Sequence, residues 1–308
     1  MKFILRLQKI LRLAFQWRMC YNNTKERKGS PMNFEKTIFE NRQTKKGPFL
    51  AAHRGVCGAN IPCNSMAAYK IALAQGADVV EIDVSKSRDG KFFVFHPGME
   101  HVFLKSARPI AEMDAAEVEA LYLVNQDSTP TSYKVPTLRE VLRLLKDKAY
   151  INVDKFWIDV EGITKEIREA GVEKQVIVKT NTDEKSLVAV KKYAPDLMFM
   201  PLVRDEDKVT EDLLAAGVNV IGAEVLFSTE DLPCISEAYV AEMHRKGLLL
   251  WANAIIYNER DVISAHRTDD RSLIESPEEG WGWLIDRGMD FIQTDWLSML
   301  KNYIENRK

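Results

Sequence analysis

Short apolar runs alternate with amphipathic segments along the chain from residue 49 onward. Continuous hydrophobic runs are typical of strands buried on both faces. Such runs lie at 49–52, 79–84, 150–154, 175–179, 198–203, 218–224, 248–253 and 291–295. Helix-like segments lie between them at 65–75, 138–145, 163–170, 184–193, 210–216 and 235–246. This alternation predicts parallel strands with right-handed crossovers, and eight such strands favour a closed (β/α)8 barrel over an open sheet.

Two stretches depart from the alternation. Asp89-Gly90 is a hairpin-type turn signal, so the run that ends at His96 is expected to pair antiparallel with its neighbour, outside the barrel. Residues 98–135 contain one short helix-like piece, 115–121, and a polar segment. We expect 98–135 to be an insertion that covers the site, because long loops above catalytic strand ends commonly serve as lids or walls.

The chain is expected to have two parts, a leader and linker at 1–46 and the barrel domain at 47–308. Its 308 residues, 46% of them hydrophobic, are enough for one large core, and the formal net charge of −2 gives no footprint for nucleic acid. Four scattered cysteines predict neither a disulfide framework nor a zinc site, which favours a reducing, cytoplasmic setting.

The first residues form a separate pattern. Over residues 1–19, Lys2, Arg6, Lys9 and Arg12 share one side of a helical projection and bulky apolar residues share the other. A basic amphipathic helix of this kind can lie on an anionic membrane surface, but its cations interrupt any membrane-spanning run. Membrane-surface helix, export signal and mis-assigned start all stay open, with Met32 as the alternative start.

Polar side chains stand where several apolar runs end. His53 follows the first run, His96 ends the hairpin run, and Asp154 ends the run at its strand. Glu81 and Asp83 are two positions apart, so a strand places both carboxylates on one face. Histidines and carboxylates at the carboxyl ends of strands indicate a metal-assisted hydrolytic site that suits a hard divalent cation.

Other residues near strand ends are candidates for the wall of the site. They are Glu224, Trp251, Asn253 and Asp295. Each has a structural alternative: Asp295 fits a helix cap equally well, and Trp251 fits packing inside the barrel.

Taken in order, these motifs resemble the glycerophosphodiester phosphodiesterase family. The resemblance extends from about Phe49 to Leu300. It is carried by His53-Arg54-Gly55, Asn64-Ser65, Gly76-Ala77-Asp78, Glu81-Ile82-Asp83-Val84, Asp89-Gly90, His96, Val135-Pro136-Thr137-Leu138, Trp251-Ala252-Asn253 and Thr294-Asp295.

The resemblance implies a (β/α) barrel phosphodiesterase of glycerol and lipid metabolism. Mg²⁺ or Ca²⁺ would be held by Glu81, Asp83 and Asp154, while His53 and His96 would be the acid and base. The implied substrate is a small glycerophosphodiester, and the products are glycerol 3-phosphate and an alcohol. Either water or the free glycerol hydroxyl would attack the phosphorus, the latter by way of a cyclic phosphate.

The chain departs from the family pattern at three places. The family has acids where Cys63 and Pro97 stand, and a Glu with a lysine two residues later where this chain has Asp154. Arg54 and a lysine are expected to pair with the phosphate. Strand alternation puts Lys155 on the face opposite Asp154, so Lys179 on the next strand is the alternative.

Two other functions stay open from the sequence. A phospholipase D-like lyase that acts on lysolipid diesters is favoured by the apolar residues 102–104 and by the basic leader. A non-catalytic binding relative is favoured by Cys63 and Pro97, whereas both histidines and the three metal-type carboxylates favour an enzyme.

Overall fold

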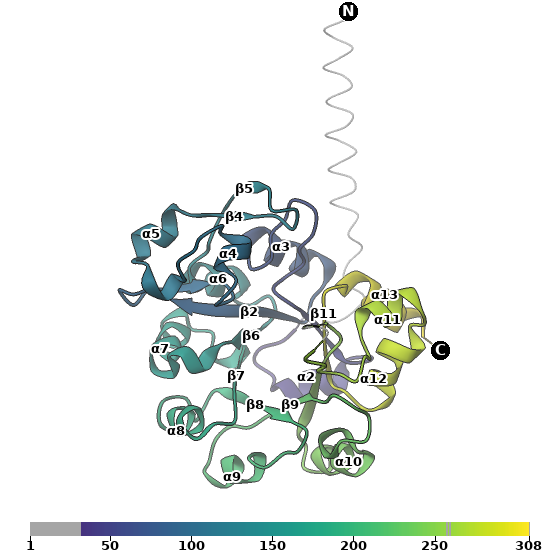
Figure 1. Cartoon of the computed structure of the whole chain (residues 1–308). Helices are drawn as coiled ribbons and strands as arrows, with labels where there is room; N and C mark the ends of the chain where they lie inside the picture. The colour runs from purple at the N-terminus through teal and green to yellow at the C-terminus, as the bar shows by residue number, and fades with distance from the viewer. Residues whose placement is uncertain (1–31, 257, 259, 308) are drawn as a thin grey trace, which may run out of the picture. The chain divides into compact units, whose positions relative to one another are not determined.

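The computed structural model describes residues 32–256, 258 and 260–307, and the amphipathic helix expected at 1–19 lies outside them. Within the described residues, eight parallel strands close into a barrel in the order β1-β11-β10-β9-β8-β7-β6-β2, and β2 pairs with β1. This confirms the predicted (β/α)8 barrel, and helices surround it (Figure 1). Its strands are β1 (Phe49–Ala52), β2 (Val79–Lys86), β6 (Tyr150–Asp154), β7 (Val176–Thr180), β8 (Met198–Arg204), β9 (Gly222–Leu226), β10 (Leu249–Asn253) and β11 (Phe291–Thr294).

Most helices begin and end near the predicted positions, because their caps are local sequence signals. Ser65 caps α3, which Gly76 ends in a left-handed conformation, and Thr137 starts α6 with a capping box. The pattern did not predict α11, α12 or α13; the first two have only six and four residues, too few for a helical period to be visible. These helices are α3 (Met66–Gln75), α6 (Leu138–Leu145), α7 (Val160–Ala170), α8 (Glu184–Tyr193), α9 (Thr210–Ala215), α10 (Glu237–Arg245), α11 (Asp269–Ile274), α12 (Trp283–Asp286) and α13 (Leu297–Asn306).

Aromatic side chains fill the barrel near the start of its strands. The rings of Trp251 and Phe291 stack with centroids 4.9 Å apart, and Phe291 lies 5.0 Å from Phe49. Phe49 meets Tyr150 edge to face at 5.9 Å. Trp251 is fully buried among these rings, which agrees with packing inside the barrel, and its place in the wall of the site stays a prediction. Because this end of the interior is apolar, the polar residues of the strands gather toward the opposite end.

The antiparallel hairpin strand is present as expected. β3 (Phe92–Val94) pairs with β2 in a register that joins Phe93 to Ser85. The following insertion has its own apolar cluster, in which Leu104 is buried and against which Phe103 packs. The apolar residues 103 and 104 therefore pack within the insertion. Its elements are α4 (Glu100–Phe103), α5 (Ala115–Ala120), β4 (Tyr122–Val124) and β5 (Pro130–Lys134).

The β4–β5 hairpin was not predicted, because the residues of β5 are exposed or half-buried and carry no apolar face. Its turn reaches the loop that follows β1, where Asn125 Nδ2 lies 3.4 Å from Asn60 Oδ1. That contact supports the expectation that the insertion borders the site, which stays a prediction.

A helix that the sequence did not predict lies just before the barrel. The linker prediction is wrong for α2 (Ile38–Thr44), which has a capping box at Thr37. Asn41 Nδ2 donates to the Tyr150 hydroxyl at 2.7 Å, and Arg42 Nε donates to Asp290 Oδ1 at 2.8 Å. These partners stand at or before the start of barrel strands, so α2 binds the end of the barrel away from the strand carboxyl ends. The sequence of this segment is polar and shows no apolar helical face, because the helix is stabilised by its tertiary contacts with the barrel.

The described residues contain no helix that is long and apolar enough to cross a membrane.

Candidate metal and active site

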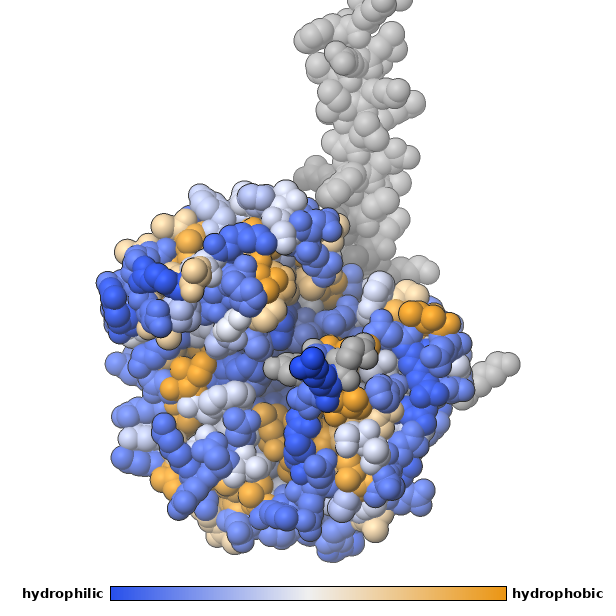
Figure 2. Space-filling view, viewed as in Figure 1, coloured by the Kyte–Doolittle hydropathy of each residue, from blue (hydrophilic) through white to orange (hydrophobic). Residues whose placement is uncertain are grey.

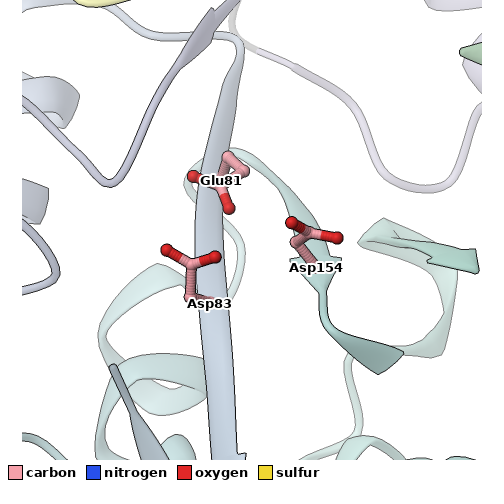
Figure 3. Close-up of side chains that lie close together, drawn as sticks. All are labelled: Glu81, Asp83 and Asp154. Atoms are coloured by element: carbon pink, nitrogen blue, oxygen red, sulfur yellow. The ribbon is translucent and has the colours of Figure 1, made fainter. Parts of the chain in front are cut away.

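Three carboxylates meet where β2 and β6 run side by side. Parallel pairing joins Asp83 to Asp154, and Glu81 lies two residues before Asp83 on the same face of β2. Oxygen atoms of the three, here called the acidic cluster, lie within 4.8 Å of one another (Figure 3). Glu81 and Asp83 are only 2% and 1% exposed. The cluster is a set of oxygen donors that fits a hard divalent cation.

Burial and mutual repulsion oppose full ionisation of the three carboxyl groups in the acidic cluster. Burial raises the pKa of Glu81 well above its ordinary value, and the charges of Asp83 and Asp154 raise it further. Burial also acts to raise the pKa of Asp83, but Arg54 and Lys155 outweigh it and lower this pKa. A divalent cation would relieve the charge that keeps Glu81 from ionising, so the residues present fit a metal.

The backbone after β1 brings Arg54 onto the acidic cluster. Arg54 is left-handed at φ 54°, and its N–H donates to Glu81 Oε2 at 2.7 Å. Its side-chain Nε lies 2.9 Å from Asp83 Oδ2, an ion pair without hydrogen-bond alignment. The next residue is Gly55 at φ +81°, where a Cβ would stand 2.8 Å from the backbone of Ala68. The motif His53-Arg54-Gly55 therefore includes a glycine that no larger residue replaces without strain.

Lys155 lies in the site, contrary to the prediction from strand alternation. The residue is left-handed at φ 60°, because β6 has already ended at Asp154. This turn directs its Nζ back to 2.7 Å from Asp154 Oδ2 and 3.7 Å from Asp83 Oδ1. Burial opposes a charge on Lys155, but the two carboxylates raise its pKa above the ordinary value. A fixed cation thus stands beside the acidic cluster.

His96 presents one free ring nitrogen to the acidic cluster. Its Nδ1 lies 2.8 Å from the carbonyl oxygen of Pro97, which can only accept, so Nδ1 carries the proton. Its Nε2 lies 4.0 Å from Asp83 Oδ1 and has no hydrogen-bond partner. Burial lowers the pKa of His96, although the Asp83 charge opposes this. The neutral ring therefore has an available base at Nε2.

His53 is held by a different partner. Its Nδ1 lies 2.8 Å from Asp295 Oδ1, and its backbone N–H donates to the Thr294 carbonyl at 3.2 Å. The structure thus pairs the first predicted histidine with the last predicted acid, across the junction of β1 and β11. A carboxylate at Nδ1 fixes the orientation of the ring and leaves its Nε2 free to meet an incoming group.

Four other predicted residues form one buried network inside the barrel. Lys179 Nζ lies 2.6 Å from Glu224 Oε2 and 3.1 Å from the centroid of the Trp251 ring. Glu224 Oε1 accepts from Asn253 Nδ2 at 2.6 Å. Lys179 is 1% exposed, and burial lowers its pKa although Glu224 opposes this. Both lysines considered from the sequence therefore have carboxylate partners, Lys155 at the acidic cluster and Lys179 in this network.

Two buried residues, Asn64 and Asp269, also contact the site, and sequence reasoning gave neither of them a role there. Asn64, left-handed at φ 52°, donates from Nδ2 to Asp83 Oδ2 at 2.9 Å and accepts from the Tyr69 hydroxyl at 2.8 Å. Its place in the Asn64-Ser65 pair was the available signal. Asp269 accepts from the backbone N–H of Asp295 at 2.8 Å, and no local pattern marked it.

Two of the three departures from the family pattern, Cys63 and Pro97, have clear local consequences. Burial raises the pKa of the Cys63 thiol to about 12, so this position is neutral. Pro97 contributes its carbonyl to His96 Nδ1.

The chain matches the model of the glycerophosphoryl diester phosphodiesterase family over residues 53–296. A glycerophosphodiester phosphodiesterase of Caldanaerobacter subterraneus is 32% identical over 156 residues, which are 48% of this chain and 63% of that protein. A Bacillus subtilis protein of the same name is 26% identical over 231 residues, covering 68% of this chain and 77% of its own length.

Solved structures share the fold at lower identity. A glycerophosphoryl diester phosphodiesterase from Parabacteroides distasonis superposes with a TM-score of 0.69 at 21% identity, covering 84% of this chain and 87% of that one. An Oleispira antarctica phosphodiesterase, solved in complex with the product sn-glycerol-3-phosphate, gives a TM-score of 0.60 at 20% identity. It covers 84% of this chain and 98% of the other.

Proposed function

Because the chain belongs to the glycerophosphoryl diester phosphodiesterase family, we propose that it hydrolyses glycerophosphodiesters to glycerol 3-phosphate and an alcohol in a metal-dependent reaction. The observation that carries the proposal is the acidic cluster, with His96 Nε2 4.0 Å from Asp83 and with His53 adjacent in sequence to Arg54, which contacts the cluster; both rings are held at Nδ1. The face in Figure 2 is mainly hydrophilic, with hydrophobic residues in separate patches.

Glu81, Asp83 and Asp154 would hold the cation, Mg²⁺ or Ca²⁺. Both ions prefer oxygen ligands, and the cluster supplies carboxylates that are buried on β2 and half-buried on β6. When bound, the ion would neutralise charge on the phosphodiester and so lower the barrier to attack.

Arg54 and Lys155 would bind the phosphodiester oxygens. Both cations already lie against the acidic cluster, Arg54 Nε at 2.9 Å from Asp83 and Lys155 Nζ at 2.7 Å from Asp154. Charge-assisted hydrogen bonds from such groups orient the phosphorus toward the histidines.

The histidines would move the protons. His96 Nε2, unpartnered and neutral, would take the proton of the attacking hydroxyl. His53, paired with Asp295, would give the Nε2 proton to the leaving alkoxide. Lys179, Glu224 and Asn253 offer polar atoms inside the barrel for the glycerol hydroxyls.

Phosphorus NMR tests the proposal directly. Purified protein is incubated with glycerophosphocholine or glycerophosphoethanolamine, with Mg²⁺, with Ca²⁺ or with a chelator. Glycerol 3-phosphate that forms only with metal supports the hydrolase. A cyclic phosphate that persists would point to a lyase, and no reaction on either diester would favour a binding relative.

A further inference from the structure

A buried carboxyl group lies behind the His53–Asp295 pair. Asp269 begins α11 and is 3% exposed. Its Oδ1 accepts hydrogen bonds from Trp281 Nε1 and Thr294 Oγ1, both at 2.7 Å, and its Oδ2 accepts from the Asp295 backbone N–H at 2.8 Å. In the part of the chain that the structure describes, no cation pairs with it.

Keeping an acid here is costly. Burial raises the pKa of Asp269 to about 7, although its three hydrogen bonds act to lower it. Two of those bonds fix the turn after β11, through the Thr294 side chain and the Asp295 backbone. Thr294 Oγ1 also accepts from the Trp296 N–H at 2.9 Å. The cost of burying this acid is therefore offset by the order it gives to a turn of three residues.

That turn carries the partner of His53. The Asp295 side chain is 45% exposed, and its Oδ1 meets His53 Nδ1 at 2.8 Å. A carboxylate exposed to this degree keeps one orientation only when its backbone is held. We propose that Asp269 is a positioning residue, which fixes the turn after β11 so that Asp295 faces His53 Nδ1. The inference rests on the proposed role of His53 in proton transfer.

A double-mutant cycle separates positioning from a general structural effect. Asp269→Asn keeps the size of the side chain but replaces one acceptor oxygen with an NH₂ donor, at a place where all three neighbouring groups are donors. The kcat should therefore fall about 10- to 100-fold, with KM changed less. Asp295→Asn should lower kcat at least as much, and the double variant should be no slower than Asp295→Asn. Asp270→Asn, an exposed neighbour on the same helix, should keep the wild-type rate.

Each outcome of the cycle has one meaning. Equal rates of Asp269→Asn and wild type, or independent effects that multiply in the double variant, would overturn the positioning role. If His53→Ala keeps the wild-type rate, the proposed function of the histidine fails, and the inference falls with it. A slow His53→Ala with a normal Asp269→Asn leaves the proposed function intact and refutes only the inference.

A second variant and a spectroscopic measurement keep the test decisive if Asp269→Asn fails to fold. Thr294→Val removes one hydrogen bond to Asp269 and then replaces Asp269→Asn in the same cycle, with the same criteria. The ¹⁵N shifts of the His53 ring report which nitrogen carries the proton. Nδ1 should be fully protonated in the wild type, where Asp295 accepts from it, and only partly protonated in the folded variant; an unchanged Nδ1 shift would contradict positioning.

Discussion

Replacing Glu81 with glutamine should stabilise the metal-free protein while destroying its response to metal. Two unit charges 4.8 Å apart repel by about 3 kcal/mol at an effective dielectric constant of about 20. Glu81 faces two such charges, but Arg54 and Lys155 offset part of the repulsion. The metal-free variant should therefore gain about 1–3 kcal/mol at pH 8, which is several degrees in Tm.

The pH dependence follows from the direction of the Glu81 shift. Because the folded-state pKa of Glu81 lies above the ordinary value, its contribution to stability is complete at low pH and is lost as pH rises through the raised pKa. The metal-free wild type should therefore weaken as pH rises above the ordinary glutamate pKa of about 4.5, and the advantage of Glu81→Gln should grow as it does. The raised pKa of Asp269 acts in the same direction, so the difference between the two proteins is the quantity to read.

Urea unfolding in a chelator, repeated with Mg²⁺ or Ca²⁺, measures both effects. Saturating metal should raise the unfolding free energy of the wild type by about 3 kcal/mol at a concentration 100 times Kd, and should leave Glu81→Gln unchanged. Glu305→Gln, an exposed acid on α13, is the matched control. Metal-free Glu81→Gln that is no more stable than wild type at pH 8 would refute the argument from charge repulsion.

Other changes have equally definite outcomes. His53→Ala and His96→Ala should each lower turnover about 10²- to 10⁴-fold in the phosphorus NMR assay, yet should still be stabilised by metal; a loss of metal response would contradict the separate roles. Lys155→Met should raise KM and lower kcat/KM about 10- to 100-fold, because it removes a phosphate contact, and an unchanged KM would argue against that contact. Gly55→Ala should destabilise the protein more than Gly247→Ala in urea unfolding, since both have positive φ but only Gly55 meets backbone within 3 Å; equal losses would show that φ alone sets the cost.

Much of the barrel was predictable from sequence because its strands are buried on both faces. Runs such as Tyr150–Asp154 and Leu249–Asn253 are short and almost continuously apolar, which is typical of strands buried on both faces. Capping residues such as Ser65 mark where the helices between the strands begin. The acidic cluster followed from the same logic, since the strand period places Glu81 and Asp83 together and parallel pairing brings Asp154 beside them.

The residues that sequence reasoning misplaced depend on single backbone angles or on distant partners. Strand alternation fails at Lys155 because one left-handed residue reverses the direction of its side chain. Asp269 is adjacent to Asp295 only through the fold, and α2 is stable only against the barrel. The local sequence pattern predicts secondary structure, whereas these three features depend on a single backbone angle or on tertiary contacts that the pattern does not contain.

The helix α2 also has a consequence for shortened forms of the protein. Asp78 accepts from the Leu50 amide and pairs with Lys45, and Asp290 accepts from the Leu250 amide and pairs with Arg42. A chain that began at residue 47 would keep every proposed catalytic residue but would leave both acids without these cations, at the points where β1 and β10 begin. Residues 34–46 thus fold as one unit with the barrel. Truncation at residue 47 would reduce the amount of folded protein rather than alter its chemistry.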